Sequence, residues 1–317
     1  MRARADKGMT VQDAVDEFLI DCQMRNLSEH TVIFYRTRLR LAFGDLGTKL
    51  LSGIRIADVK SRIAELMEGR AAATLNGYLR TVKCLIYWCQ DQDYDVSISP
   101  RQLHRIKEPK HVPTSFSVEQ MNRLLAQPDR RTFQGLRDYA MMSFMLDTGA
   151  RASEVTGVTL RDIDMPIVKL HGKGDKDRLV SLSPGTQVVV SSYIRSRFKR
   201  MASVQDDEGW LFVSRYGGHY SHTGMYGMLK RYAASAGISE DVNVHPHAFR
   251  STFATHFLRN GGNIIHLQQI MGHTTLAMSQ YYASVVDSDA FESSMQNSPM
   301  AMLTTGGTQR RRRGPKR

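Results

Sequence analysis

The sequence contains few cysteines and no long apolar run, and these features bear on the cellular compartment of the protein and on its association with membranes. Only three cysteines occur in 317 residues, at positions 22, 84 and 89, and their spacing fits no metal-ligand pattern. Cys22 and Cys89 fall on apolar helix stripes, where we expect small buried hydrophobic side chains. No apolar run approaches the roughly 20 residues of a spanning helix, and the start leads into a charged helix rather than a signal core. We therefore expect a reduced, cytoplasmic setting and no membrane partner.

Motifs for nucleotide and metal chemistry are missing as well. The sequence lacks a G-x-x-x-x-G-K-[ST] loop, which argues against ATP hydrolysis. It also lacks clustered carboxylates at Mg²⁺-binding spacing. We expect neither a metal nor another cofactor.

Positive charge, in contrast, is abundant. The chain carries 43 Lys and Arg against 31 Asp and Glu, a formal net charge of +12. Such a surplus favours a polyanionic partner, and double-stranded DNA fits better than an anionic membrane. A hydrophobic content of 41% provides for packed cores, and the length predicts about two domains.

The first hundred residues predict a small all-helical domain with basic faces. Thr10 is typical of an N-cap, and Ser28 starts a second helix. Apolar residues then recur at helical spacing. The predicted helices run from Val11 to Cys22, Ser28 to Phe43, Ile56 to Met67 and Ala72 to Asp91. We expect five basic side chains of this domain to bind DNA: Arg36, Arg38, Arg40, Arg80 and Lys83.

Prolines at 100, 109 and 113 interrupt the helical pattern and place an interdomain linker at 101–113. A second domain at 114–298 is predicted to open with a capping box from Ser117 to Gln120. The last segment, 299–317, ends in RRRRGPKR and is expected to be a disordered basic tail.

The second domain is predicted to be mainly helical with a small antiparallel sheet, so the whole chain is of mainly α, or α+β, class. Two strands flank the polar turn His171–Asp177, and a further short strand is expected nearby. The predicted strands are Ile167–Leu170, Arg178–Leu182 and Trp210–Val213, and the predicted helices are 186–200, 221–236, 246–260 and 263–271.

Six residues of this domain stand out in order along the chain, although each alone has an ordinary explanation as an ion pair, a cap or a core residue. The motifs are R-x-S-E, G-K-G-x-K-x-R, H-x-x-R, G-H and a tyrosine nine residues later. The residues are Arg151, Lys173, His247, Arg250, His273 and Tyr282. In this order they resemble the catalytic signature of the tyrosine recombinases, the phage integrase family. The resemblance spans about residues 115–290, and the first hundred residues look like the core-binding domain of that family.

The resemblance implies a DNA recombinase of compact, Xer-like or simple integrase type. Tyr282 would be the nucleophile that forms a 3′-phosphotyrosyl intermediate, and its spacing from His273 favours it over Tyr281. Lys173 would protonate the leaving 5′-oxygen. Ser251 and Ala283 stand where histidine and threonine are frequent in the family, but neither position has a catalytic role.

The chemistry explains why these residue types are needed. Two guanidiniums can neutralise a phosphodiester and stabilise its pentavalent transition state. Only about one tyrosine in a thousand is phenolate at pH 7, so a proton acceptor such as His247 is needed. Cutting and joining then require neither metal nor ATP.

Several alternatives stay open at this point. A type IB topoisomerase shares the chemistry, a decayed recombinase would only bind DNA, and a metal-dependent nuclease would use the histidines as ligands. Within the family, the sequence leaves open integration or excision of a mobile element and Xer-type resolution. Four strand cuts with one nucleophile per chain predict a homotetramer on two DNA sites. A nucleoid-associated location and an accessory directionality protein are further expectations.

Overall fold

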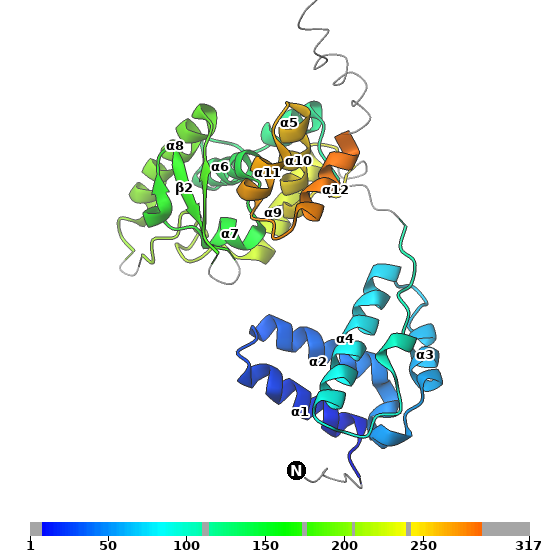
Figure 1. The fold of residues 1–317 in the computed structure, drawn as a ribbon. Helices are drawn as coiled ribbons and strands as arrows, with labels where there is room; N and C mark the ends of the chain where they lie inside the picture. The colour runs from blue at the N-terminus through cyan, green and yellow to red at the C-terminus, as the bar shows by residue number, and fades with distance from the viewer. Residues whose placement is uncertain (1–7, 110–113, 173–175, 205–206, 239–241, 287–317) are drawn as a thin grey trace, which may run out of the picture. The chain divides into compact units, whose positions relative to one another are not determined.

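The computed structural model describes residues 8–109, 114–172, 176–204, 207–238 and 242–286. The chain divides into two compact units, 1–111 and 112–317 (Figure 1). Its described residues are mainly helical with one three-stranded antiparallel sheet, which confirms the predicted fold class. Two expectations lie outside the described residues: the place of Lys173 and the basic tail.

Unit 1 is a helical domain built around one apolar core. The first helix begins where Thr10 and Asp13 form a capping box, with the Asp13 carboxylate accepting from the Thr10 backbone at 2.9 Å. Phe18, Leu39 and Val82 come from three helices and are buried together. The elements are α1 (Val11–Met24), α2 (Glu29–Phe43), η1 (Gly44–Thr48), η2 (Leu51–Gly53), α3 (Ile56–Glu65), α4 (Ala72–Asp91) and η3 (Pro100–Gln102).

The chain after α4 stays attached to unit 1 as far as it is described. Leu103 is buried in the unit 1 core. The side-chain amide of Asn76 on α4 donates to the Ile106 carbonyl at 2.8 Å and to Glu108 at 2.6 Å. The described part of 101–113, up to residue 109, therefore packs on α4.

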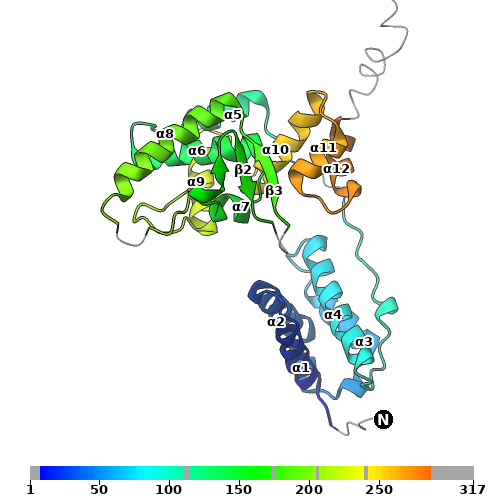
Figure 2. The same ribbon diagram turned by 60° about the vertical axis from the view of Figure 1, so that its left-hand side comes forward.

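Unit 2 combines short and long helices with a small sheet. Its described elements are α5 (Val118–Leu125), α6 (Phe133–Thr148), α7 (Ala152–Gly157), η4 (Leu160–Asp162), β1 (Ile163–Asp164), β2 (Ile167–Leu170), β3 (Arg178–Ser181), α8 (Pro184–Met201), α9 (His222–Ser235), α10 (Pro246–Arg259), α11 (Ile264–Met271) and α12 (Leu276–Val286). α12 packs against α10 and α11, and the three helices lie together at one end of the unit (Figures 1 and 2).

The sheet confirms two of the three predicted strands. Its order is β1-β2-β3, and β2 pairs with β3 in antiparallel register, with Val168 opposite Val180. The predicted strand Trp210–Val213 is wrong. Trp210 forms an isolated β-bridge with Thr159, and Val213 forms a second one with His219. Because the two ends of the segment pair with different partners, the segment forms no continuous strand.

Candidate active site

One pocket of about 420 Å³ in unit 2 gathers most of the residues that the motifs singled out. Its walls come from the start of α7, α9, the start of α10, the loop before α12, and α12 itself. Five of the six predicted catalytic residues line it: Arg151, His247, Arg250, His273 and Tyr282. The sixth, Lys173, lies outside the described residues, between β2 and β3.

Arg151 is the N-cap of α7 and is held by the acidic residue of its own motif. Its backbone N–H donates to Oε2 of Glu154 at 2.6 Å, and its Nη1 donates to Oε1 at 2.8 Å. Its Nη2 donates to the carbonyl of Gly272 at 3.0 Å. The side chain remains 37% exposed, so the fixed guanidinium still faces the pocket.

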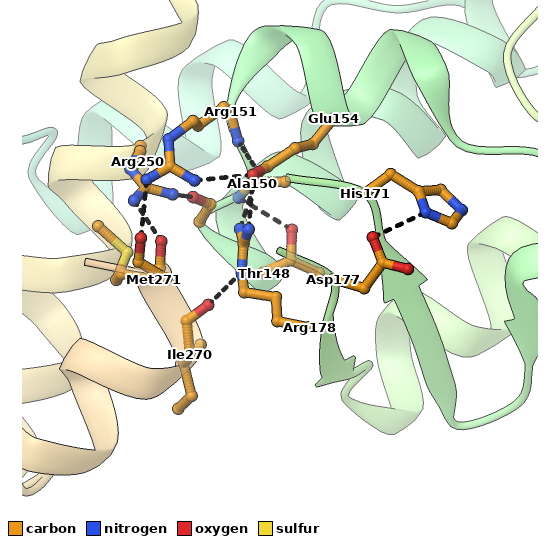
Figure 3. Close-up of polar contacts among 12 residues, drawn as sticks. Thr148, Ala150, Arg151, Glu154, His171, Asp177, Arg178, Arg250, Ile270 and Met271 are labelled. Carbon is orange, nitrogen blue, oxygen red and sulfur yellow. Dashed lines mark hydrogen bonds and ion pairs between the residues drawn. The ribbon is translucent and has the colours of Figure 1, made fainter. Parts of the chain in front are cut away.

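Glu154 has a second cationic partner, Arg178 at the start of β3 (Figure 3). Arg178 donates from Nη1 to Oε1 at 2.5 Å and from Nη2 to Oε2 at 2.8 Å. Burial of Glu154 opposes its ionisation, but the hydrogen bonds from Arg178 and Arg151 outweigh burial and hold its pKa below the ordinary value. The carboxylate is therefore charged and shared between two guanidiniums.

Arg250 reaches the same pocket from α10 and is almost fully buried. Its Nη1 donates to the carbonyl of Gly149 at 2.6 Å, and its Nη2 donates to that of Met271 at 2.5 Å. Burial, together with the positive charge of Arg151, lowers the pKa of Arg250 to about 10, so it stays a cation at neutral pH. A phosphate oxygen placed between the two arginines would relieve this repulsion.

Glycine is needed at the two turns that supply these carbonyls. Gly149 ends α6 with φ +60° and Gly272 ends α11 with φ +61°, which is the left-handed region. A Cβ at Gly149 would lie 2.5 Å from the ring of Phe253. Both helix ends therefore require glycine to bring their backbone oxygens to the arginines.

His273 and Tyr282 stack on one another at the wall of the pocket. Their ring centroids are 6.1 Å apart and their planes differ by 10°. His273 Nδ1 lies 2.9 Å from the hydroxyl of Ser279, one turn before Tyr282 on α12. Burial, followed by the charges of Arg250 and Arg151, lowers the pKa of His273 to about 4. The imidazole is therefore neutral at physiological pH.

His247 and Tyr281 are exposed members of the pocket. His247 lies in the first turn of α10, one turn before Arg250, so the two side chains share a helix face. Its ring stacks on that of His245, with centroids 6.2 Å apart. Tyr281 is 41% exposed, whereas Tyr282 is only 4% exposed. Both tyrosines line the pocket, with ring centroids 5.6 Å apart.

The two ends of the β2–β3 hairpin are joined by a histidine between two carboxylates. His171 Nε2 lies 2.8 Å from Asp162, and its Nδ1 lies 3.0 Å from Asp177. Asp177 in turn forms an ion pair with Lys169 at 2.8 Å. The hydrogen bonds with Asp162 and Asp177 raise the pKa of His171. This arrangement fixes the described ends of the hairpin whose turn contains Lys173.

The five basic residues predicted to bind DNA lie on different faces of unit 1. Arg36 and Arg40 line a pocket of about 210 Å³ formed by α1, α2 and η1. Arg80 and Lys83 line another of about 440 Å³ beside α4. The guanidinium of Arg38 instead lies 3.7 Å from the ring centroid of Phe34 and 5.6 Å from that of Tyr78.

Sequence reasoning gave no role to Glu154, Arg178 or Ser279, which hold the predicted residues in place. Two of them were visible as motif positions. Glu154 closes R-x-S-E at the i+3 spacing of a capping box, and Arg178 closes G-K-G-x-K-x-R. The contact between Ser279 and His273 arises from the turn before α12 and has no such signal.

Metal clusters and membrane spans are both absent from the described part of the chain. Within it, no three or more His, Cys, Asp or Glu side chains are grouped so that they could hold a metal ion. Nor does any helix there have the length and apolar character needed to cross a membrane.

Comparison with known proteins agrees with this geometry. Residues 115–288 match the phage integrase family. Tyrosine recombinase XerD of Shewanella oneidensis is 31% identical over 295 residues, or 90% of this chain and 96% of the relative. Tyrosine recombinase XerC of Oceanobacillus iheyensis is 29% identical over 296 residues, with the same coverage. The Tn1549 transposon integrase, solved with transposon right end DNA, has the same fold, with a TM-score of 0.73 at 21% identity over 92% of this chain and 99% of that one.

The fold and the pocket define an enzyme that acts on DNA strands through a tyrosine. The chain belongs to the phage integrase family, whose match covers more than half of its length. It is a site-specific recombinase of the tyrosine type, similar to the Xer recombinases.

Proposed function

We propose that Tyr282 cuts one DNA strand by attacking a phosphodiester that lies against Arg151 and Arg250. The attack would form a bond from the phenolic oxygen to phosphorus and release the 5′-oxygen of the next nucleotide. The link would be a 3′-phosphotyrosine, and a 5′-hydroxyl from another strand would reverse it. The observation that carries this proposal is the single pocket in which both arginines, both histidines and Tyr282 meet.

The proposed charge distribution suits a pentavalent phosphorane. Arg151 and Arg250 are anchored to backbone carbonyls, so their orientation is fixed before DNA arrives. Preorganised donors of this kind stabilise charge that develops in the transition state. In the proposed mechanism neutral His273 accepts from the hydroxyl of Ser279 at Nδ1, and it would donate one hydrogen bond to a phosphate oxygen from Nε2.

Proton transfer falls to two further residues in this proposal. His247 is exposed at the pocket and would accept the phenolic proton of Tyr282 during attack, then return it on reversal. Lys173 would protonate the leaving 5′-oxygen, a role that rests on the G-K-G-x-K-x-R motif alone.

The proposed substrate is a specific double-stranded DNA site bound by both units. Unit 1 would contribute its basic side chains to the duplex, and these are Arg36, Arg38, Arg40, Arg80 and Lys83. Strand exchange between two duplexes needs four cuts, so the proposed active species is a homotetramer on two sites. The setting would be the cytoplasm, on the nucleoid, and an accessory protein could set the direction of exchange.

Two cellular roles suit the relatives. The XerC and XerD names indicate recombination of the Xer type, and the Tn1549 transposon integrase was solved in complex with transposon right end DNA. For this chain we propose either Xer-type resolution or integration and excision of a mobile element. Sequencing the DNA that is covalently trapped on the protein in cells decides between them, because one predicts a chromosomal resolution site and the other predicts element ends.

An assay with two target sites on one supercoiled plasmid tests the function itself. A recombinase yields deletion or inversion products with exchanged strands. Relaxation without exchange would instead indicate a type IB topoisomerase activity, and binding without cleavage would indicate a DNA-binding regulator.

A further inference from the structure

The strongest unassigned feature of the molecule is the buried ion cluster behind Arg151. Glu154 is 1% exposed at its side chain, and both of its oxygens are occupied. Oε1 accepts from Nη1 of Arg151 at 2.8 Å and from Nη1 of Arg178 at 2.5 Å. Oε2 accepts from the Arg151 backbone at 2.6 Å and from Nη2 of Arg178 at 2.8 Å.

The two arginines hold this carboxylate in different ways. Arg178 binds the carboxylate through two hydrogen bonds, and its Nε donates to the Ile270 carbonyl at 2.6 Å. Its side chain is 9% exposed. Arg178 does not line the pocket, whereas Arg151 does. Arg151 gives Glu154 only one side-chain nitrogen and keeps a 37% exposed side chain (Figure 3). Arg178 would therefore act on the phosphate through Glu154 and Arg151 rather than as a residue that lines the pocket.

The balance of charge in this cluster shows why Arg178 matters. One carboxylate and two guanidiniums leave a single positive charge in excess, and that charge faces the pocket on Arg151. Without Arg178 the cluster would be neutral. Glu154 would then be a buried carboxylate with a single cationic partner, and it would draw Arg151 into a bidentate pair. A guanidinium held in that way offers less charge and fewer free N–H groups to a phosphate.

We propose that Arg178 is a positioning residue for the recombination reaction, which neutralises Glu154 so that Arg151 keeps its charge and free N–H groups for the scissile phosphate. This inference rests on the proposed role of Arg151. The alternative is that Arg178 only ties β3 to the end of α11 and stabilises the fold.

A double-substitution experiment separates the two roles. The proteins are wild type, Arg178→Gln, Glu154→Gln, the Arg178→Gln/Glu154→Gln double variant, and Arg151→Gln. The readout is the rate of covalent adduct formation on a nicked target duplex at saturating DNA, measured beside the melting temperature of each protein.

We expect Arg178→Gln to cleave DNA about 100-fold slower than wild type, which is comparable with the loss of one preorganised donor. Removing the carboxylate as well should restore the rate at least about tenfold above Arg178→Gln, because Arg151 is no longer sequestered.

The matched control is a second arginine–carboxylate ion pair with the same hydrogen-bond arrangement, and neither of its residues lines the pocket. Arg197 is fully buried, grips Asp207 through two bonds of 2.9 and 2.5 Å, and donates to the Trp210 carbonyl at 2.7 Å. Arg197→Gln should lower the melting temperature, and adding Asp207→Asn should not raise the cleavage rate of the folded protein.

Four results would overturn the inference. A folded Arg178→Gln protein that cleaves at the wild-type rate is the first, and a double variant no faster than Arg178→Gln is the second. If Arg178→Gln does not fold, Arg178→Lys decides, because it keeps the charge. Cleavage by Arg178→Lys within about tenfold of wild type supports neutralisation, and a 100-fold loss in a folded protein contradicts it.

The Arg151→Gln variant separates failure of this inference from failure of the proposed function. Full activity of Arg151→Gln would refute both. An inactive Arg151→Gln beside a normal Arg178→Gln would refute the inference alone.

Discussion

The ring of Tyr282 lies parallel to that of His273, with 6.1 Å between centroids and 10° between planes. The Gly272 turn and α12 together fix the two residues. Gly272 sets the turn into His273, and α12 carries Tyr282 as well as Ser279, the hydrogen-bond partner of His273. The nine-residue spacing in the sequence therefore has a structural cause. The chain turns at Gly272, the residue before His273, and α12 then brings Tyr282 back to the same pocket.

Acidification should destabilise the protein through His273. Its folded-state pKa of about 4 lies below the ordinary value, so the unfolded chain takes up a proton first as the pH falls. The stability that depends on neutral His273 is complete above about pH 6.5 and is lost towards pH 4, by up to about 3 kcal/mol. Urea unfolding of wild type and His273→Gln at pH 7 and pH 4.5 measures it. Wild type should lose more stability than the variant, and equal losses would contradict the assignment.

His171 should titrate in the opposite direction. Its hydrogen bonds with Asp162 and Asp177 raise its pKa, so its contribution to stability is present at low pH and fades as the pH rises through the folded-state value. An NMR titration of the imidazole should show a pKa that falls towards the ordinary value in Asp177→Asn. The control is Asp164→Asn, which alters an exposed carboxylate on β1. A His171 pKa that is the same in all three proteins would rule out this ion-pair arrangement.

The basic residues of α2 should differ in how much each contributes to folding in addition to DNA binding. Arg36 and Arg40 are exposed, so replacing both with alanine should weaken DNA binding and leave stability within about 0.5 kcal/mol. The slope of log K against log salt should flatten by about 0.9 for each phosphate that the variant no longer neutralises. Arg38→Ala is the comparison, because its packing on Phe34 and Tyr78 should contribute about 1 kcal/mol of folding free energy. An unchanged salt slope in the double variant would remove Arg36 and Arg40 from the interface.

Strand cleavage should proceed in excess EDTA and without ATP. In the proposed mechanism, the positive charge that the transition state needs comes from Arg151 and Arg250, which are held by backbone carbonyls. Adduct formation should therefore be equal in EDTA and in Mg²⁺ once the ionic strength is matched. Cleavage that strictly requires Mg²⁺ would support a metal-dependent nuclease instead.

Periodicity and caps predicted the amphipathic elements closely. The helix Ala72–Asp91 has the predicted bounds, because one regular apolar stripe faces the unit 1 core. The predicted strand Ile167–Leu170 also has its predicted bounds. Cys22 and Cys89 are buried as expected.

Elements that lack a single apolar stripe were not predicted correctly. Helix α6 has buried residues around much of its circumference, including Arg137 and Asp138, so it shows no two-sided pattern. The segment Trp210–Val213 has consecutive buried residues, which a strand shares with an irregular core segment. The ordered motifs predicted five of the residues that meet in the pocket, and the sixth, Lys173, lies outside the described residues. The sharing of Glu154 by two arginines depends on β3 lying beside α7 and could not be read from spacing.

The most direct test of the account is to identify the residue that becomes linked to DNA. A nicked target duplex that releases its 5′-hydroxyl fragment traps the intermediate, and the linked peptide is then mapped by mass spectrometry. We predict a 3′-phosphate joined to Tyr282, no adduct with Tyr282→Phe, and an adduct with Tyr281→Phe. A link at Tyr281, or an adduct that persists in Tyr282→Phe, would contradict the central claim.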